Sequence, residues 1–148
     1  MGWADLETSL DPQPLFRVEG PDGERSWSEI ERVVRFRRLM RDLAPAVLVC
    51  AIPNAGRRNP RQARREGIQG GAFDYLVAWG IRQIAFPEFK GYDARGRAGT
   101  LSDAQIDWGN RMYLLGHHVG CFFRPETAIG WLRDCGAPIR GGEHGKRA

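Results

Sequence analysis

The apolar residues of this chain fall into short runs, and this pattern limits most strongly the folds that it can adopt. The longest apolar stretch, residues 44–52, has the length of a strand and is far below the roughly 18 residues of a membrane span. Three more strand-sized runs follow, at residues 74–79, 83–90 and 119–123. Helical spacing of apolar residues precedes, separates and follows these runs. The pattern predicts an α/β fold in which a small mixed β-sheet is flanked by helices.

Three main helices are expected, over residues 29–43, 102–115 and 125–134, with a short one over 60–66. At the start of the first, Ser28 with Glu31 matches a capping box, and so does Ser26 with Glu29. Its apolar residues recur at helical spacing and are expected to face the core: Ile30, Val33, Val34, Phe36, Met40 and Leu43. Residues 47–52 after it are expected to form a buried strand.

The 148 residues fit a single domain, which we place at residues 28–138. Residues 1–27 are rich in proline, glycine and acids, and we expect an irregular arm that docks through Trp3, Leu15 or Phe16. Residues 139–148 are expected to form a mobile tail. The first residues lack a basic start followed by an apolar block, so no signal peptide or membrane contact is expected. Three widely spaced cysteines suggest a reducing, cytoplasmic location, with Cys50 and Cys121 as small core residues.

The cations of the chain are almost all arginine. The net charge is +4, and only Lys90 and Lys146 among the 22 basic residues are lysine. Guanidinium groups bind phosphate oxygens through two hydrogen bonds, which favours a nucleic-acid partner, although a compositional bias of the genome would give the same excess.

Most of one nine-residue stretch is basic, and we predict that it binds DNA phosphates. The spacing of positions 57, 61, 64 and 65 puts them on one helical face, and two further arginines in the loop after Lys90 would reach the same DNA backbone. A solvated basic face is the alternative. The predicted DNA-binding residues are Arg57, Arg58, Arg61, Arg64, Arg65, Arg95 and Arg97.

The chemistry is expected around Asp74, Glu88 and Lys90. Strand side chains alternate, so Glu88 and Lys90 point to one face, and Asp74 begins the neighbouring strand. Carboxylate oxygens suit Mg²⁺ or Mn²⁺, which lower the pKa of water and neutralise charge on a reacting phosphate. The lysine would orient or deprotonate the attacking water. A solvated charge pair on a strand is the alternative. The apolar run before Glu88 favours burial instead, and buried charged groups need compensating partners, which favours a functional site.

Several ordered motifs resemble one known family. They are Ala51-Ile52-Pro53-Asn54-Ala55-Gly56-Arg57-Arg58, Asp74 followed by Leu76-Val77-Ala78-Trp79, Glu88-Phe89-Lys90, Leu101-Ser102-Asp103-Ala104-Gln105 with Trp108, and Cys121-Phe122-Phe123 with Trp131-Leu132. Together they resemble the VRR-NUC nucleases, a branch of the PD-(D/E)xK phosphodiesterases, over roughly residues 28–137. The resemblance implies a restriction-endonuclease-like core.

The resemblance also implies the roles of individual residues. Asp74, Glu88 and the backbone carbonyl of Phe89 would bind the metal, Lys90 would be the catalytic lysine, and Gln105 would steady the nucleophile or the lysine. A glutamate of the first helix would line the site, where Glu29 matches best and Glu31 is the rival. Without the resemblance, Gln105 would be interpreted as a capping residue paired with Ser102.

Two positions depart from the family pattern. Phe73 stands where a proline usually precedes the aspartate, and that proline is not a metal ligand. Pro87 precedes Glu88, and because proline donates no hydrogen bond in a sheet we expect a bulge there. His117 and His118 with Cys121 form a weaker metal candidate, since two histidines after a helix-ending glycine more often cap carbonyls.

The sequence therefore predicts a Mg²⁺- or Mn²⁺-dependent DNA endonuclease. By resemblance to short stand-alone members of the family, it would act as a homodimer on branched or four-way junction DNA. The rival hypotheses are a non-catalytic DNA-binding subunit that retains the fold and a structural protein with a basic face.

Overall fold

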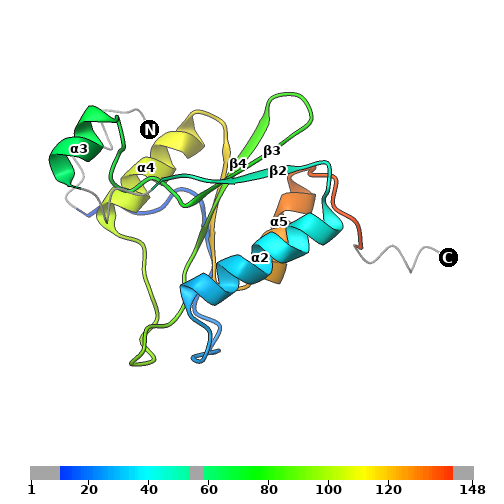
Figure 1. Ribbon diagram of the computed structural model, residues 1–148, viewed down its shortest axis with the longest axis horizontal. Helices are drawn as coiled ribbons and strands as arrows, with labels where there is room; N and C mark the ends of the chain where they lie inside the picture. Colours follow the sequence, from blue (N-terminus) through cyan, green and yellow to red (C-terminus); the bar gives the residue numbers. More distant parts are fainter. Residues whose placement is uncertain (1–10, 54–58, 142–148) are drawn as a thin grey trace.

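The computed structural model describes residues 11–53 and 59–141. Five strands form one mixed sheet in the order β1-β5-β4-β3-β2. Helices α2 (Glu29–Leu43) and α5 (Pro125–Asp134) cover one face, and α4 (Asp103–Leu114) covers the other (Figure 1). The short α3 (Pro60–Arg65) lies near α4 in this view. The predicted α/β fold with a mixed sheet flanked by helices is confirmed.

One side of the sheet is an antiparallel meander, and the other side is parallel. Strands β2 (Leu48–Ala51), β3 (Tyr75–Trp79) and β4 (Gln83–Phe89) pair antiparallel in sequence order. After β4 the chain crosses through α4 and returns as β5 (His118–Phe122), parallel to β4. A parallel pair requires such a crossover connection.

Residues 11–27 are more ordered than their composition suggests. They contribute β1 (Arg17–Val18), which pairs parallel with β5, so the expectation of a wholly irregular arm was wrong. Phe16 is buried and packs edge-on against Phe73, with ring centroids 5.6 Å apart. Trp3 and the tail from residue 142 lie outside the described residues.

The expected burial of β2, and of part of α2, was wrong. This strand forms the edge of the sheet, and both Cys50 and Leu48, which is 60 % exposed, face solvent. On α2, Phe36 and Met40 are buried, whereas Ile30 and Val34 are 71 % and 57 % exposed. The apolar residues of α2 therefore occupy two faces, and only one of them meets the core.

An ion pair joins the N-terminal segment to the fold. Arg32 and Asp22 keep only 2 % and 4 % of their side chains exposed, with a nitrogen–oxygen distance of 2.6 Å. The Arg32 guanidinium also donates to the carbonyls of Trp27, Glu24 and Phe123. A buried arginine is tolerated because its donors are satisfied in this way.

Among the described residues, no helix is both long and apolar enough to cross a membrane.

Candidate functional site

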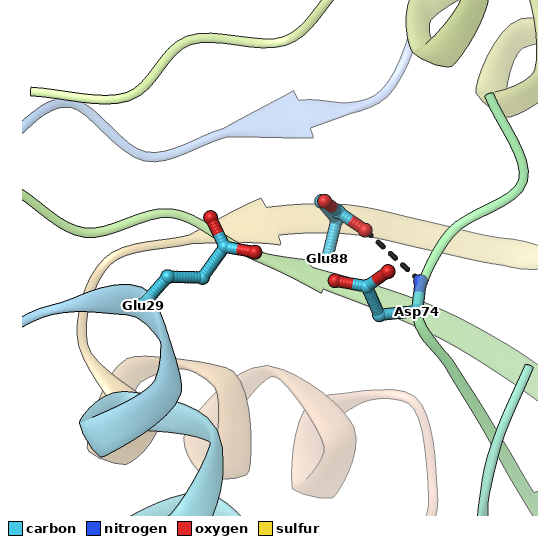
Figure 2. A group of neighbouring side chains, drawn as sticks. All are labelled: Glu29, Asp74 and Glu88. Carbon is cyan, nitrogen blue, oxygen red and sulfur yellow. Dashed lines mark hydrogen bonds between the residues drawn. The ribbon is translucent and has the colours of Figure 1, made fainter. Parts of the chain in front are cut away.

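Three carboxylates from three elements meet at one end of the sheet. Glu29 begins α2, Asp74 immediately precedes β3, and Glu88 lies in β4. One carboxylate oxygen from each residue lies within 4.8 Å of the others, and the three groups point toward one another (Figure 2). Glu88 is 1 % exposed, and Glu29 and Asp74 are half-buried.

The way that β3 and β4 separate places Asp74 beside Glu88. Their backbone pairing ends at Val77 and Ala85, so the strands are not bonded to each other beyond that pair. The N–H of Asp74 donates instead to the Glu88 carboxylate at 3.0 Å. Pro87 remains in register with Gly120 of β5, and each residue of β4 from Ala85 to Phe89 has one partner there, so the expected bulge is absent from the β5 side.

A glycine brings the third carboxylate to this sheet end. A Cβ added to Gly91 would lie 2.3 Å from the backbone nitrogen of Glu29 and 2.5 Å from the carbonyl carbon of Ser28. Only glycine therefore permits the first turn of α2 to lie against the chain just after β4.

The structure also separates the two candidate glutamates of α2. Glu31 forms the capping box with Ser28, accepting from the Ser28 N–H at 2.7 Å, and its side chain is exposed. Glu29 is therefore the glutamate that joins the acidic cluster. Sequence alone could not distinguish them, since both fit an acidic first turn.

Lys90 and Gln105 adjoin the acidic cluster. The Lys90 ammonium lies 3.3 Å from a Glu88 oxygen and donates to the Gln105 side-chain carbonyl at 3.0 Å. The Gln105 amide nitrogen donates to Glu88 at 2.8 Å. Gln105 also forms the capping box of α4 with Ser102. It therefore both caps this helix and contacts Lys90.

Burial and mutual repulsion of the carboxylates disfavour full ionisation of the cluster. Burial, followed by the charge of Asp74, raises the pKa of Glu88 to about 7. Burial likewise raises the pKa of Glu29, against the opposing effect of Lys90. A bound cation would stabilise the ionised form of such buried carboxylates. It would neutralise their charge in place of a proton and of the water that burial excludes.

The donor set fits a hard divalent cation. It consists of the oxygens of three carboxylates. The backbone carbonyl of Phe89 lies at the same end of β4, and the Phe89 side chain is fully buried in the core under α2. All-oxygen sites suit Mg²⁺ or Mn²⁺ rather than softer metals.

The predicted phosphate-binding arginines are dispersed. Arg57 and Arg58 lie outside the described residues. Arg61, Arg64 and Arg65 are exposed on α3, as is Arg95 in the loop after β4. Arg97 bonds to Asp93 at 2.8 Å, and it also lines a cavity of about 340 Å³ beside Glu29.

Both histidines of the weaker metal candidate, His117 and His118, have structural contacts. His118 stacks on Trp79 with ring centroids 5.7 Å apart and bonds to Gln83 at 2.9 Å, and His117 lies edge-on to Phe86. Sequence reasoning missed Gly91 and also Gly71, where a Cβ would lie 2.3 Å from the carbonyl oxygen of Ala104 at the start of α4. A glycine directly after Glu88-Phe89-Lys90 was the available signal for the first.

Comparison with known proteins gives no match to a family model, to a curated protein or to a solved structure. The resemblance to VRR-NUC nucleases therefore stays a prediction.

Proposed function

We propose that this protein is a divalent-metal-dependent nuclease that hydrolyses phosphodiester bonds in DNA, built on a restriction-endonuclease-like core. The observation that carries the proposal is the convergence of Glu29, Asp74 and Glu88 beside Lys90 and Gln105. An acidic cluster alone is common on protein surfaces. A nearly fully buried glutamate that contacts a lysine and a glutamine in the same cluster is uncommon, because burial of charge is unfavourable unless it is compensated.

Asp74 and Glu88 are the proposed metal ligands, with Glu29 and the Phe89 carbonyl completing the oxygen set. A bound Mg²⁺ or Mn²⁺ supplies Lewis-acid chemistry, which polarises the phosphate and makes water more acidic. The roles of the remaining residues follow from their contacts.

We assign to Lys90 two roles, orienting the attacking water and offsetting charge that develops on the phosphate. Its ammonium has two fixed acceptors, Gln105 and Glu88, which restrict it to one region of the site. Gln105 acts on Lys90 and Glu88, and we therefore assign it as a positioning residue. Preferred substrates are proposed to be branched DNA, including four-way junctions, cut by a homodimer.

The direct test is cleavage of a DNA panel of four-way junction, flap, nicked duplex, duplex and single strand, each with Mn²⁺, with Mg²⁺ and with chelator. We expect hydrolysis with either metal and none in chelator. Full activity in chelator would overturn the metal-dependent mechanism. Binding of DNA without cleavage of any substrate would instead support the non-catalytic subunit.

A further inference from the structure

Three adjoining cavities follow α2 past the acidic cluster, and we refer to them together as the α2 groove. One section, of about 380 Å³, lies between α2, β2 and the start of β3, and its lining includes Glu29 and Asp74. It shares Val34 and Arg37 with a second section of about 650 Å³ farther along α2. In the other direction it shares Glu29 and Ile30 with the cavity beside Arg97. The cluster therefore lies within the length of the groove.

The walls of the groove are apolar and unusually exposed. Ile30 and Val34 of α2 expose 71 % and 57 % of their surface, and Val33, Ala51 and Tyr75 line the section beside the cluster. Exposed aliphatic side chains of this size along a groove indicate a partner with apolar surface.

The rim of the groove is positively charged. Arg37, Arg38 and Arg41 follow Ile30 and Val34 on the same helix and are exposed. Within residues 11–53 and 59–141, no carboxylate forms an ion pair with Arg37 or Arg38, and Arg41 pairs with its exposed neighbour Asp42 at 3.6 Å. At the opposite end Arg97 is paired with Asp93, so the unpaired positive charge lies along α2. The groove thus combines apolar walls with a row of arginines along α2.

From this combination we infer that the α2 groove binds a single unpaired DNA strand and leads it across the acidic cluster. The inference rests on the proposed nuclease function. An unpaired strand offers apolar base faces and phosphates together, whereas in a duplex the base faces are stacked inside. From Glu29 to Arg41 the helix rises about 18 Å, which matches about five nucleotides of a stacked strand.

A second copy of the chain fits this face less well. In a two-fold pair the same patch meets itself, so Arg37, Arg38 and Arg41 of both copies would approach one another. Like charges brought together across an interface are unfavourable. The charge of the rim therefore favours a polyanion.

The test measures binding of fluorescent DNA by anisotropy in chelator, with the full chain and three ligands: a single strand, the same strand with abasic sites, and its duplex. Wild-type protein should bind the single strand more tightly than the duplex. The double variant Ile30→Ser/Val34→Ser should bind the normal strand at least about fivefold more weakly, because the serines leave less apolar surface to bury against the bases. Its affinity for the abasic strand should change little.

Arg37→Gln should weaken binding of both single strands and reduce the salt slope by about 0.7, as expected for one lost phosphate contact on a single strand. Ile81→Ser and Arg82→Gln are the matched controls, since they make the same changes in exposed residues of the β3–β4 turn. They should bind as wild type. Groove variants that bind all three ligands as wild type would overturn the inference.

Sedimentation equilibrium on the same variants tests the other occupant. A wild-type dimer that becomes monomeric in Ile30→Ser/Val34→Ser, with unchanged strand affinity, would assign the face to a second copy and overturn the inference. The two proposals fail separately. Strand binding that depends on the groove without cleavage of any DNA would contradict only the nuclease function, and cleavage with unaffected groove variants would contradict only the groove.

Discussion

Glu88 is the residue whose environment departs most from that of an ordinary carboxylate. It is almost fully buried, and its polar neighbours are the Asp74 N–H, Gln105, Lys90 and the carboxylates of Asp74 and Glu29. Stability of this arrangement depends on what neutralises the glutamate: a proton, Lys90 or a cation. Each alternative has a measurable consequence.

The first prediction concerns pH. Because the pKa of Glu88 in the folded protein is raised to about 7, its contribution to stability is greatest below its ordinary value of 4.5 and is lost as the pH rises through about 7. In chelator, we expect the contribution of Glu88 to the melting temperature to decrease between pH 5 and pH 7.5. Manganese should reverse the trend, since it binds the ionised form.

Thermal melts of wild type and Glu88→Gln across this pH range provide the check. The glutamine variant should lack the contribution, so the difference in melting temperature between the two proteins should change with pH. A difference that stays constant would mean that Glu88 ionises as an exposed carboxyl does.

The second prediction separates chemistry from binding. Lys90→Met removes the ammonium but fills much of the same space, so the fold and the affinity for Mn²⁺ and DNA should persist. Single-turnover cleavage should fall by about 100-fold or more, because the lysine acts on the water and the developing charge. Cleavage at the wild-type rate, measured alongside metal calorimetry and gel shift, would show that Lys90 has only a structural role.

At the level of elements, the site depends on how closely α2 approaches the end of β4. Gly91 permits that approach, and the first turn of α2 then carries Glu29 into the cluster. Neither fact follows from the helical or strand pattern, since a pattern identifies elements but not the distance between them.

The third prediction tests this contact. Gly91→Ala should force the start of α2 away, destabilise the protein by about 1–3 kcal/mol and lower Mn²⁺ affinity. Gly130→Ala is the matched control, because α5 has open space around this glycine, and alanine there should hold or raise stability by up to about 1 kcal/mol. Urea unfolding and calorimetry measure both effects. An unchanged metal affinity in Gly91→Ala would mean that Glu29 is not needed for binding.

Much of the secondary structure was predictable because it is local. The bounds of α2 and α5 match the predictions, and those of β3, β4 and β5 differ by one residue at one or both ends. Strand alternation predicted that Glu88 and Lys90 point the same way, and Asp74 was expected beside them at the start of the neighbouring strand. Burial of β2 was mispredicted because an apolar run does not reveal whether its strand is at the edge or in the middle of a sheet. The strand at Arg17–Val18 was missed because its order comes from distant partners.

At the level of the whole molecule, the N-terminal segment is part of the fold. The Asp22–Arg32 pair joins it to α2, and the Asn110 side chain accepts from the Leu15 N–H at 2.8 Å and donates to the Gln13 carbonyl at 2.9 Å. All of these contacts are buried or half-buried. The two Asn110 bonds connect residues that are 95 and 97 positions apart in the sequence.

The fourth prediction follows from this connection. Asp22→Asn should destabilise the protein by about 3 kcal/mol, because the buried Arg32 loses its counter-charge. Burial alone would raise the pKa of Asp22, but hydrogen bonds from Arg32 and Glu24 bring it below its usual value, so this stabilisation should weaken as the pH falls through that range. Denaturant unfolding at pH 7 tests the loss, and a change within about 0.5 kcal/mol would show that the segment is dispensable.

The central claim is that Glu29, Asp74 and Glu88 form a divalent-metal site, and calorimetric titration of Mn²⁺ at pH 7.5 tests it most directly. We expect saturable binding to the wild-type protein. Asp74→Asn keeps the size of the side chain but removes one anionic ligand, so it should bind at least about tenfold more weakly while remaining folded by circular dichroism. If wild type and Asp74→Asn bind Mn²⁺ equally, or wild type does not bind it, the cluster is not a metal site and the account is contradicted.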